Sequence, residues 1–311
     1  MKIAFIFPGQ GAQYVEMGKE LADKYPEVME TFLEADKAID FDLSKMCFEG
    51  PEEDLNKTEY TQPTVLATSY ALYKILENRG VKPEAVAGLS LGEYTGLVVG
   101  GAIDFQDALR LVQKRGKYMQ EEVPLGVGGM AAIMGMEKDP VLEVCELSKE
   151  FGIVEPANFN CPKQIVLAGE LGALEKAVEI AKEKGAKKAV MLPVSAPFHS
   201  SMLKGAGEKL SKELENVEVK ELNIPLVTNV TGDYVKSEDI KEMLKMQVSS
   251  SVLWENCMEK LIADGFDTFV EIGPGKSLSK FMKRISKEVK CVNIEDVKSL
   301  EKAMTLLGLE G

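Results

Sequence analysis

Short apolar runs alternate with amphipathic segments along the first hundred residues. The run 3–7 is apolar at every position and ends at Pro8-Gly9, which predicts a strand buried on both faces. A second short strand is predicted at 86–88. Three segments have apolar residues at helical spacing: 20–38, 64–78 and 91–100. Such an alternation of strands and helices predicts a parallel sheet covered by helices.

The pattern changes after residue 130, where strands and helices follow in the order βαββαβ of the ferredoxin-like motif. The strands are predicted at 130–136, 153–159, 164–168 and 188–194, and the helices at 140–150 and 171–184. We therefore predict a small ferredoxin-like domain at 126–196, inserted into a larger α/β domain formed by 1–125 and 197–311. The larger domain resumes with a helix at 202–213, a strand at 226–229, two helices within 240–263, a strand at 268–272 and a final helix from Lys276.

Composition and charge exclude several classes of protein. The chain is 45% hydrophobic and 28% charged, which is typical of a globular fold, and its net charge of −13 disfavours nucleic acid and anionic membranes as partners. The longest uncharged apolar stretch, 123–136, is shorter than the ~18 residues that a membrane span needs. Five scattered cysteines without a C-x-x-C pair fit reduced thiols in a cytoplasm, and a single histidine argues against a metal site.

The segment 88–92, GLSLG, is a G-x-S-x-G motif between a predicted strand and a predicted helix, the context of a nucleophile elbow. Its serine, Ser90, would need a neutral base, and His199 is the only histidine in the chain. That residue lies in the loop 195–200, where the chain leaves the predicted insert. The alternatives are a helix-capping serine and an ordinary hydrogen-bonded histidine. If the two act together, the rate should rise with pH through one ionisation in the imidazole range.

The segment 8–13, PGQGAQ, follows the first predicted strand and so lies at the carboxyl edge of the sheet. Its two glycines allow successive amides to converge on an anion, although a plain β-turn is an equal alternative. Because the third glycine of a dinucleotide fingerprint is missing, NAD binding is disfavoured.

Seven blocks of sequence together resemble the malonyl-CoA:acyl carrier protein transacylases, the stand-alone acyltransferases of fatty-acid synthesis. In chain order they are FPGQGAQ at 7–13, TQP at 61–63, GLSLGEY at 88–94, RGKYMQ at 115–120, ANFNCPKQIVLAG at 157–169, APFHS at 196–200 and EIGPGK at 271–276. The resemblance implies a hydrolase-like α/β domain that carries a ferredoxin-like insert.

The resemblance also implies the roles of individual residues. Ser90 would be the nucleophile, His199 its base, and Arg115 the clamp for the malonyl carboxylate through paired hydrogen bonds. Supporting roles fall to the backbone carbonyl of Gln247, which would orient the imidazole, to the amides of Gln10 and Leu91 as oxyanion hole, and to Gln62, Asn160 and Phe198 as pocket residues. Without the resemblance, Arg115 would be interpreted as a surface residue of a helix at 108–119. Leu89 departs from the family, which has a histidine there, and this puts the substrate preference in question.

The resemblance implies a cytoplasmic, monomeric enzyme. It would move malonyl from coenzyme A to Ser90 and then to the phosphopantetheine thiol of acyl carrier protein, a transient partner. The reaction would be of the ping-pong type and would use no cofactor or metal. Three alternatives stay open. They are a serine thioesterase or hydrolase, a non-catalytic subunit that binds the carrier protein, and a trans-acting polyketide acyltransferase.

Two lysine-rich segments are candidate docking sites for an acidic carrier protein. In the helix from Lys276, the lysines at 276, 280, 283 and 287 fall on one face, and Lys280 and Lys283 are the central pair. The second cluster lies at 182–188, where a merely solvated helix face is the preferred interpretation.

Overall fold

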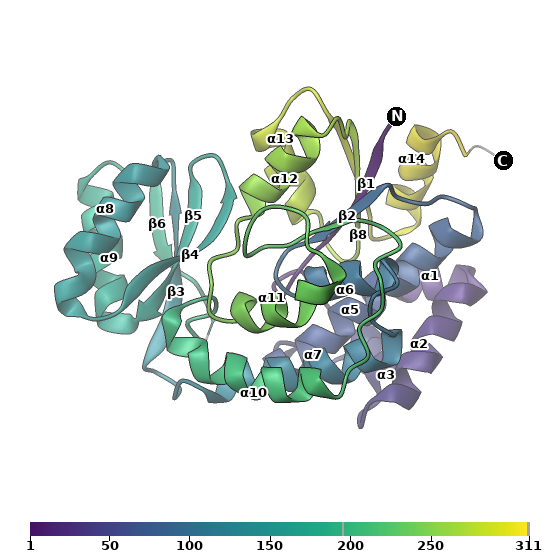
Figure 1. The fold of residues 1–311 in the computed structure, drawn as a ribbon, viewed down its shortest axis with the longest axis horizontal. Helices are drawn as coiled ribbons and strands as arrows, with labels where there is room; N and C mark the ends of the chain where they lie inside the picture. Colours follow the sequence, from purple (N-terminus) through teal and green to yellow (C-terminus); the bar gives the residue numbers. More distant parts are fainter. Residues whose placement is uncertain (195, 310–311) are drawn as a thin grey trace.

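The computed structural model describes residues 1–194 and 196–309, and its strands form two separate sheets (Figure 1). The first sheet is parallel and five-stranded, in the order β7-β2-β1-β8-β9. Its strands are β1 (Ile3–Phe7), β2 (Ala85–Gly88), β7 (Leu226–Val227), β8 (Thr268–Ile272) and β9 (Lys290–Ile294). The predicted parallel sheet is therefore confirmed.

Strand β1 lies at the centre of this sheet and is buried on both faces, as its continuous apolar run predicts. Because side chains alternate along a strand, Phe5 and Phe7 enter one hydrophobic cluster, while Ala4 and Ile6 enter another. The second cluster includes side chains of α12 (Trp254–Ala263) and α13 (Ser277–Ile285). The first includes side chains of α2 (Pro26–Ala38), α5 (Thr58–Asn78), α7 (Phe105–Glu121) and α14 (Val297–Leu307).

The remaining helices around the parallel sheet are α1 (Lys19–Lys24), α2 (Pro26–Ala38), α3 (Leu43–Glu49), α4 (Glu52–Leu55), α5 (Thr58–Asn78), α6 (Gly92–Val99), α7 (Phe105–Glu121), α10 (Lys204–Glu215), α11 (Ile240–Gln247) and α14 (Val297–Leu307). The described residues also include the short 3-10 helices η2 (Ser201–Leu203) and η3 (Ser237–Asp239), and η1 (Lys149–Phe151), which lies in the predicted insert. Among the described residues, no helix is both long enough and apolar enough to span a bilayer.

The second sheet is antiparallel and lies entirely within the predicted insert. Its strands are β3 (Gly128–Met134), β4 (Val154–Cys161), β5 (Gln164–Glu170) and β6 (Lys188–Met191), in the order β4-β5-β3-β6. Helices α8 (Lys138–Ser148) and α9 (Leu171–Glu183) cover the side away from the parallel sheet (Figure 1). The boundary at 126–196 stays a prediction, and residues 310 and 311 of the predicted large domain lie outside the described residues.

Edge strand β4 also pairs with the segment between α11 and α12, through an isolated parallel bridge between Asn158 and Val252. The backbone amide of Phe159 donates to the carbonyl of Val252, and the amide of Val252 donates to the carbonyl of Ala157. Asn158 and Asn160, near the carboxyl end of β4, line the same cavity as Gly9 and Leu89, which follow β1 and β2 of the parallel sheet.

Several predicted elements were wrong in detail. The helix expected at 20–38 is two helices, because Tyr25 precedes Pro26 and is extended, with φ −121° and ψ 109°. The helix from Lys276 is not the last element, since β9 and α14 follow it. The short helices α3 and α4 were not predicted, and α5 begins at Thr58, six residues before the predicted start.

Candidate active site

Ser90 occupies the turn between β2 and α6 with a left-handed backbone, φ 54°. The glycines on either side make this turn possible. A Cβ on Gly88 would lie 1.8 Å from the carbonyl carbon of Gly92, and a Cβ on Gly92 would lie 2.1 Å from the carbonyl oxygen of Phe7. The turn thus has the strained strand-to-helix geometry of a nucleophile elbow, with the serine at its tip lining a cavity.

The histidine predicted as the base lies directly beside this serine. Ser90 Oγ and His199 Nε2 are 2.7 Å apart, and His199 Nδ1 is 2.9 Å from the backbone carbonyl of Gln247. Because a carbonyl only accepts hydrogen bonds, Nδ1 carries the proton and Nε2 is free to accept the hydroxyl proton of Ser90. The arrangement can therefore generate a nucleophilic alkoxide.

His199 is buried, and its environment favours the neutral ring. Burial, together with the nearby positive charge of Arg115, lowers the pKa of His199 from 6.5 to about 4, whereas the hydrogen bond to Gln247 opposes this shift. At neutral pH the imidazole is thus available as a base.

Arg115 projects from α7 into the site and is only 1% exposed. Its Nη1 donates to Gln62 Oε1 at 2.8 Å. Its Nη2 donates to Gln247 Oε1 at 3.0 Å and to Ser90 Oγ at 3.1 Å. The alternative of a surface arginine is therefore wrong. Since the guanidinium donates to neutral oxygens, its charge is available to an anionic group placed next to Ser90.

These groups face a cavity of about 960 Å³ between the two sheets. Of the predicted site residues, those that line it are Gln10, Gln62, Ser90, Arg115, Asn160, Phe198 and His199. The antiparallel sheet contributes Met130, Asn158 and Val166 to the wall, and α13 contributes Ser277, Leu278 and Phe281. Leu91 and Gln247 are buried behind the wall. Leu89, the departure from the family pattern, lies on the cavity surface.

The segment that carries Gln10 lies beside the elbow because β1 and β2 are adjacent, with Phe7 paired to Gly88. The amide of Leu89 donates to the carbonyl of Phe7, and a Cβ on Gly9 would lie 2.4 Å from the carbonyl oxygen of Leu89. Gln10 and Leu91 thus lie on segments in close contact, and their role as oxyanion hole stays a prediction.

The sequence analysis missed two buried residues that contact the elbow. Asn229, just beyond β7, accepts from the amide of Ser90 at 2.6 Å and donates to the carbonyl of Gly88 at 2.8 Å. Glu93, in α6, is 1% exposed. It is the only charged residue between Glu84 and Asp104, a signal in the sequence that could have revealed it.

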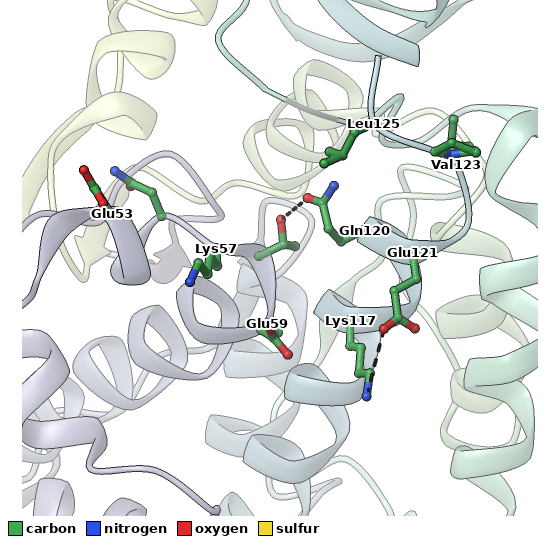
Figure 2. A pocket seen from close by; sticks show the side chains of 11 residues that line it. Glu53, Lys57, Glu59, Lys117, Gln120, Glu121, Val123 and Leu125 are labelled. Atoms are coloured by element: carbon green, nitrogen blue, oxygen red, sulfur yellow. Dashed lines mark hydrogen bonds and ion pairs between the residues drawn. The ribbon is translucent and has the colours of Figure 1, made fainter. Parts of the chain in front are cut away.

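A second hollow of about 570 Å³ opens beside the main cavity and shares Asn56 and Thr58 with it (Figure 2). Thr58 Oγ1 donates to Gln120 Oε1 at 3.2 Å, and Lys117 pairs with Glu121 at 4.0 Å. Three glutamates and two lysines line this hollow, so its charge disfavours a phosphate group. In the part of the chain that the structure describes, no three His, Cys, Asp or Glu side chains come together as a metal site requires.

Helix α13 borders the cavity with one face and exposes lysines on the other. Ser277, Leu278 and Phe281 face the cavity, while Lys280 and Lys283 are exposed. Lysines 276 and 287 are exposed as well. The structure thus places the predicted docking residues on the exposed face of a helix whose other face lines the cavity.

Comparisons with known proteins agree with this geometry. The family model "Acyl transferase domain" matches residues 4–307. A malonyl CoA-acyl carrier protein transacylase of Bacillus subtilis is 44% identical over 308 residues, which cover 98% of this chain and 97% of that protein. The crystal structure of a malonyl CoA-acyl carrier protein transacylase from Clostridium perfringens has a TM-score of 0.96 and 50% identity, covering 99% of this chain and 98% of that one. A malonyl-transacylase in complex with its type II PKS acyl-carrier protein has a TM-score of 0.96 and 40% identity, covering 98% of this chain and 100% of that one.

Proposed function

The chain belongs to the acyl transferase domain family, and on this premise we propose that it transfers malonyl from malonyl-CoA to the phosphopantetheine thiol of acyl carrier protein. The observation that carries this proposal is the buried guanidinium of Arg115, 3.1 Å from the hydroxyl of Ser90 and beside a neutral histidine. A clamp for a carboxylate thus lies next to a nucleophile that can attack a thioester.

In the first half-reaction, Ser90 Oγ attacks the thioester carbonyl while His199 Nε2 takes its proton. The amides of Gln10 and Leu91 stabilise the oxyanion of the tetrahedral intermediate. The intermediate then collapses to the malonyl-serine ester, and the imidazolium returns the proton to the departing thiolate of coenzyme A. The carrier thiol reverses these steps in the second half-reaction. The overall reaction, from thioester through ester back to thioester, is nearly thermoneutral, so the proposal includes no cofactor or metal.

Arg115 selects the acyl group by pairing both of its terminal nitrogens with the malonyl carboxylate. In the structure these nitrogens donate to Gln62, Gln247 and Ser90. A bound malonyl carboxylate replaces some of these acceptors, including Ser90 Oγ, as the hydrogen-bond partner of the guanidinium. Gln62, Asn160 and Phe198 line the same cavity and shape the space for the acyl chain.

The carrier protein is proposed to dock on the exposed lysines of α13. Carrier proteins are acidic as a class, and a protein of charge −13 needs a local positive surface to be approached productively. Lys280 and Lys283 provide that surface on a helix that borders the cavity, so a phosphopantetheine arm can enter from there.

We extend the proposal to the classification of the fold and to the setting of the enzyme. The order β4-β5-β3-β6 with βαββαβ connectivity supports a ferredoxin-like insert, and the elbow at the edge of a parallel sheet supports a hydrolase-like domain. The proposed enzyme is a cytoplasmic monomer.

A trans-acting polyketide acyltransferase is the second candidate. It is supported by the likeness to a malonyl-transacylase that was solved in complex with its type II PKS acyl-carrier protein. Because this alternative uses the same chemistry, only the identity of the carrier protein separates it from fatty-acid synthesis.

Intact-mass measurement after incubation with a panel of acyl-CoAs tests the proposed function. We expect a malonyl adduct on Ser90 that disappears when holo acyl carrier protein is added and reappears on the carrier. Release of free malonate in excess of transfer would instead indicate a thioesterase. No adduct with any acyl-CoA would indicate a non-catalytic carrier-binding subunit.

A further inference from the structure

The carboxylate of Glu93 is the meeting point of three hydrogen-bond donors in the wall behind the dyad. Oε1 accepts from Thr228 Oγ1 at 2.7 Å. Oε2 accepts from the backbone amide of Asn229 at 2.9 Å and from Gln247 Nε2 at 2.8 Å. A carboxylate is an acceptor with two oxygens, so it satisfies all three buried donors at once.

Two of these donors belong to residues that contact the dyad directly. Asn229 Oδ1 accepts from the amide of Ser90 at 2.6 Å, and the backbone carbonyl of Gln247 accepts from His199 Nδ1 at 2.9 Å. The side chain of Gln247 also donates to the carbonyl of Ser90 at 3.1 Å. The carboxylate of Glu93 is therefore connected to Ser90 through Asn229 and to His199 through Gln247.

We propose that Glu93 is a positioning residue for acyl transfer, whose carboxylate holds Asn229 and Gln247 and through them sets the turn of Ser90 against the ring of His199. The inference rests on the proposed function of this dyad. The left-handed backbone of Ser90 requires external support, because a non-glycine residue rarely adopts it. The support comes from segments far apart in the sequence, which Glu93 ties together.

In a different role, Glu93 would act as a counter-charge for Arg115. Burial raises the pKa of Glu93 and lowers the pKa of Arg115, and the charge of each group opposes the shift of the other. Two conservative variants separate these roles. Glu93→Gln keeps the reach but removes the charge. Its amide oxygen can accept from Asn229 and Gln247, and its amino group can donate to the hydroxyl of Thr228, which can rotate to accept. Glu93→Asp keeps the charge, but it is one methylene shorter and cannot reach all three donors.

The experiment is a single-turnover measurement of Ser90 acylation by quenched-flow and intact mass, with both malonyl-CoA and acetyl-CoA. For Glu93→Asp we expect a loss of about 100-fold in the acylation rate with both substrates, as for a displacement on the order of 1 Å at a reacting pair. The KM for malonyl-CoA should stay within about threefold, because Arg115 keeps its hydrogen bond to Gln62 even if the side chain of Gln247 shifts. Glu93→Gln should acylate within about threefold of wild type.

Asp36→Asn is the control, because Asp36 is a half-buried carboxylate away from the site that likewise accepts hydrogen bonds, from Ser44 N at 2.9 Å and Ser44 Oγ at 2.7 Å. It lies outside both cavities, so its acylation rate should equal that of wild type. Thermal melts show whether each variant is folded. Asn229→Ala, which frees the amide of Ser90, should slow acylation at least about tenfold even if Glu93→Asp does not fold.

A wild-type acylation rate in folded Glu93→Asp or in Asn229→Ala overturns the inference. It is also overturned if Glu93→Gln is as slow as Glu93→Asp, or if Glu93→Gln alters the ratio of malonyl to acetyl transfer, since both results indicate the counter-charge role. If wild type itself forms no malonyl-Ser90 in the same assay, the proposed function fails instead. The two failures are therefore distinguishable.

Discussion

The pH dependence of acylation tests whether a buried neutral His199 acts as the base. Only the neutral ring can accept the proton of Ser90, so kcat/KM should rise with pH through the pKa of His199 in the free enzyme. That pKa is lowered from 6.5 to about 4, which corresponds to ~3 kcal/mol in favour of the neutral ring. We therefore expect an acid limb centred near pH 4 and a flat profile from about pH 5.5 to 8.

Two causes lower this pKa, and a variant of Arg115 separates them. Burial is the larger cause, and the positive charge of Arg115 is the second. Arg115→Met removes the charge and retains an unbranched side chain in the same space. The acid limb of this variant should move to higher pH but stay below 6.5, because the burial of His199 remains.

Acetyl-CoA is the appropriate substrate for this comparison, since it has no carboxylate for Arg115 to hold. With malonyl-CoA, the bound carboxylate opposes the charge of Arg115, so the acid limb of kcat should lie at higher pH than that of kcat/KM. The assay is a quenched-flow pH series in which chemistry has been shown to limit the rate. An acid limb between pH 6 and 7 in wild type, or a downward shift in Arg115→Met, would refute the charge and burial argument.

Three further outcomes are expected. Ser90→Ala should form no acyl-enzyme by intact mass, with a change in unfolding free energy of less than about 1.5 kcal/mol; malonyl label on another residue would contradict the assigned nucleophile. Arg115→Ala should lose ~1.5 to 3 kcal/mol of transition-state stabilisation, roughly 10- to 150-fold in kcat/KM, for malonyl-CoA but much less for acetyl-CoA, and Arg115→Lys should rescue poorly; equal losses for both substrates would indicate a structural role. The double variant Lys280→Glu and Lys283→Glu, which reverses both charges, should have a higher KM for the carrier protein and an unchanged KM for malonyl-CoA. An unchanged KM for the carrier protein would indicate that docking occurs elsewhere, with the cluster at 182–188 the next candidate.

The proposed nucleophile and base could be predicted because their chemistry is visible in the residue types. A serine between glycines after a strand and a single histidine left few choices, and the family resemblance added Arg115. The structure brings Ser90 and His199, 109 positions apart, to 2.7 Å. The pKa of His199 could not be predicted, because it depends on the burial of the ring and on the charge of Arg115, which projects from α7. The sequence alone predicts an acid limb in the ordinary imidazole range, because only the pKa of a free histidine side chain could be used.

Some elements of the fold were missed for a local reason. Strand β9 has the sequence KCVNI, in which polar residues interrupt the apolar run, and its residues are mostly only half-buried. It is an edge strand of the parallel sheet, so one side lacks a neighbouring strand and the hydrophobic pattern is weak. The central strand β1 is apolar throughout because both of its faces are covered. Periodicity therefore identifies the centre of this sheet more reliably than its edge.

The hydrogen bonds between Glu93, Asn229 and Gln247 behind the dyad could not be predicted from the sequence, for a different reason. Glu93 and Asn229 are 136 positions apart, and each contact depends on the pairing of β7 with β2, which brings the segment after β7 next to the elbow. No local pattern in TNV or in GEY encodes that pairing. A charged residue inside an otherwise apolar helix does indicate a buried partner, because an unpaired carboxylate in such a place is strongly unfavourable. The sequence thus shows that Glu93 needs donors, but only the tertiary structure shows that those donors also hold the nucleophile and the base.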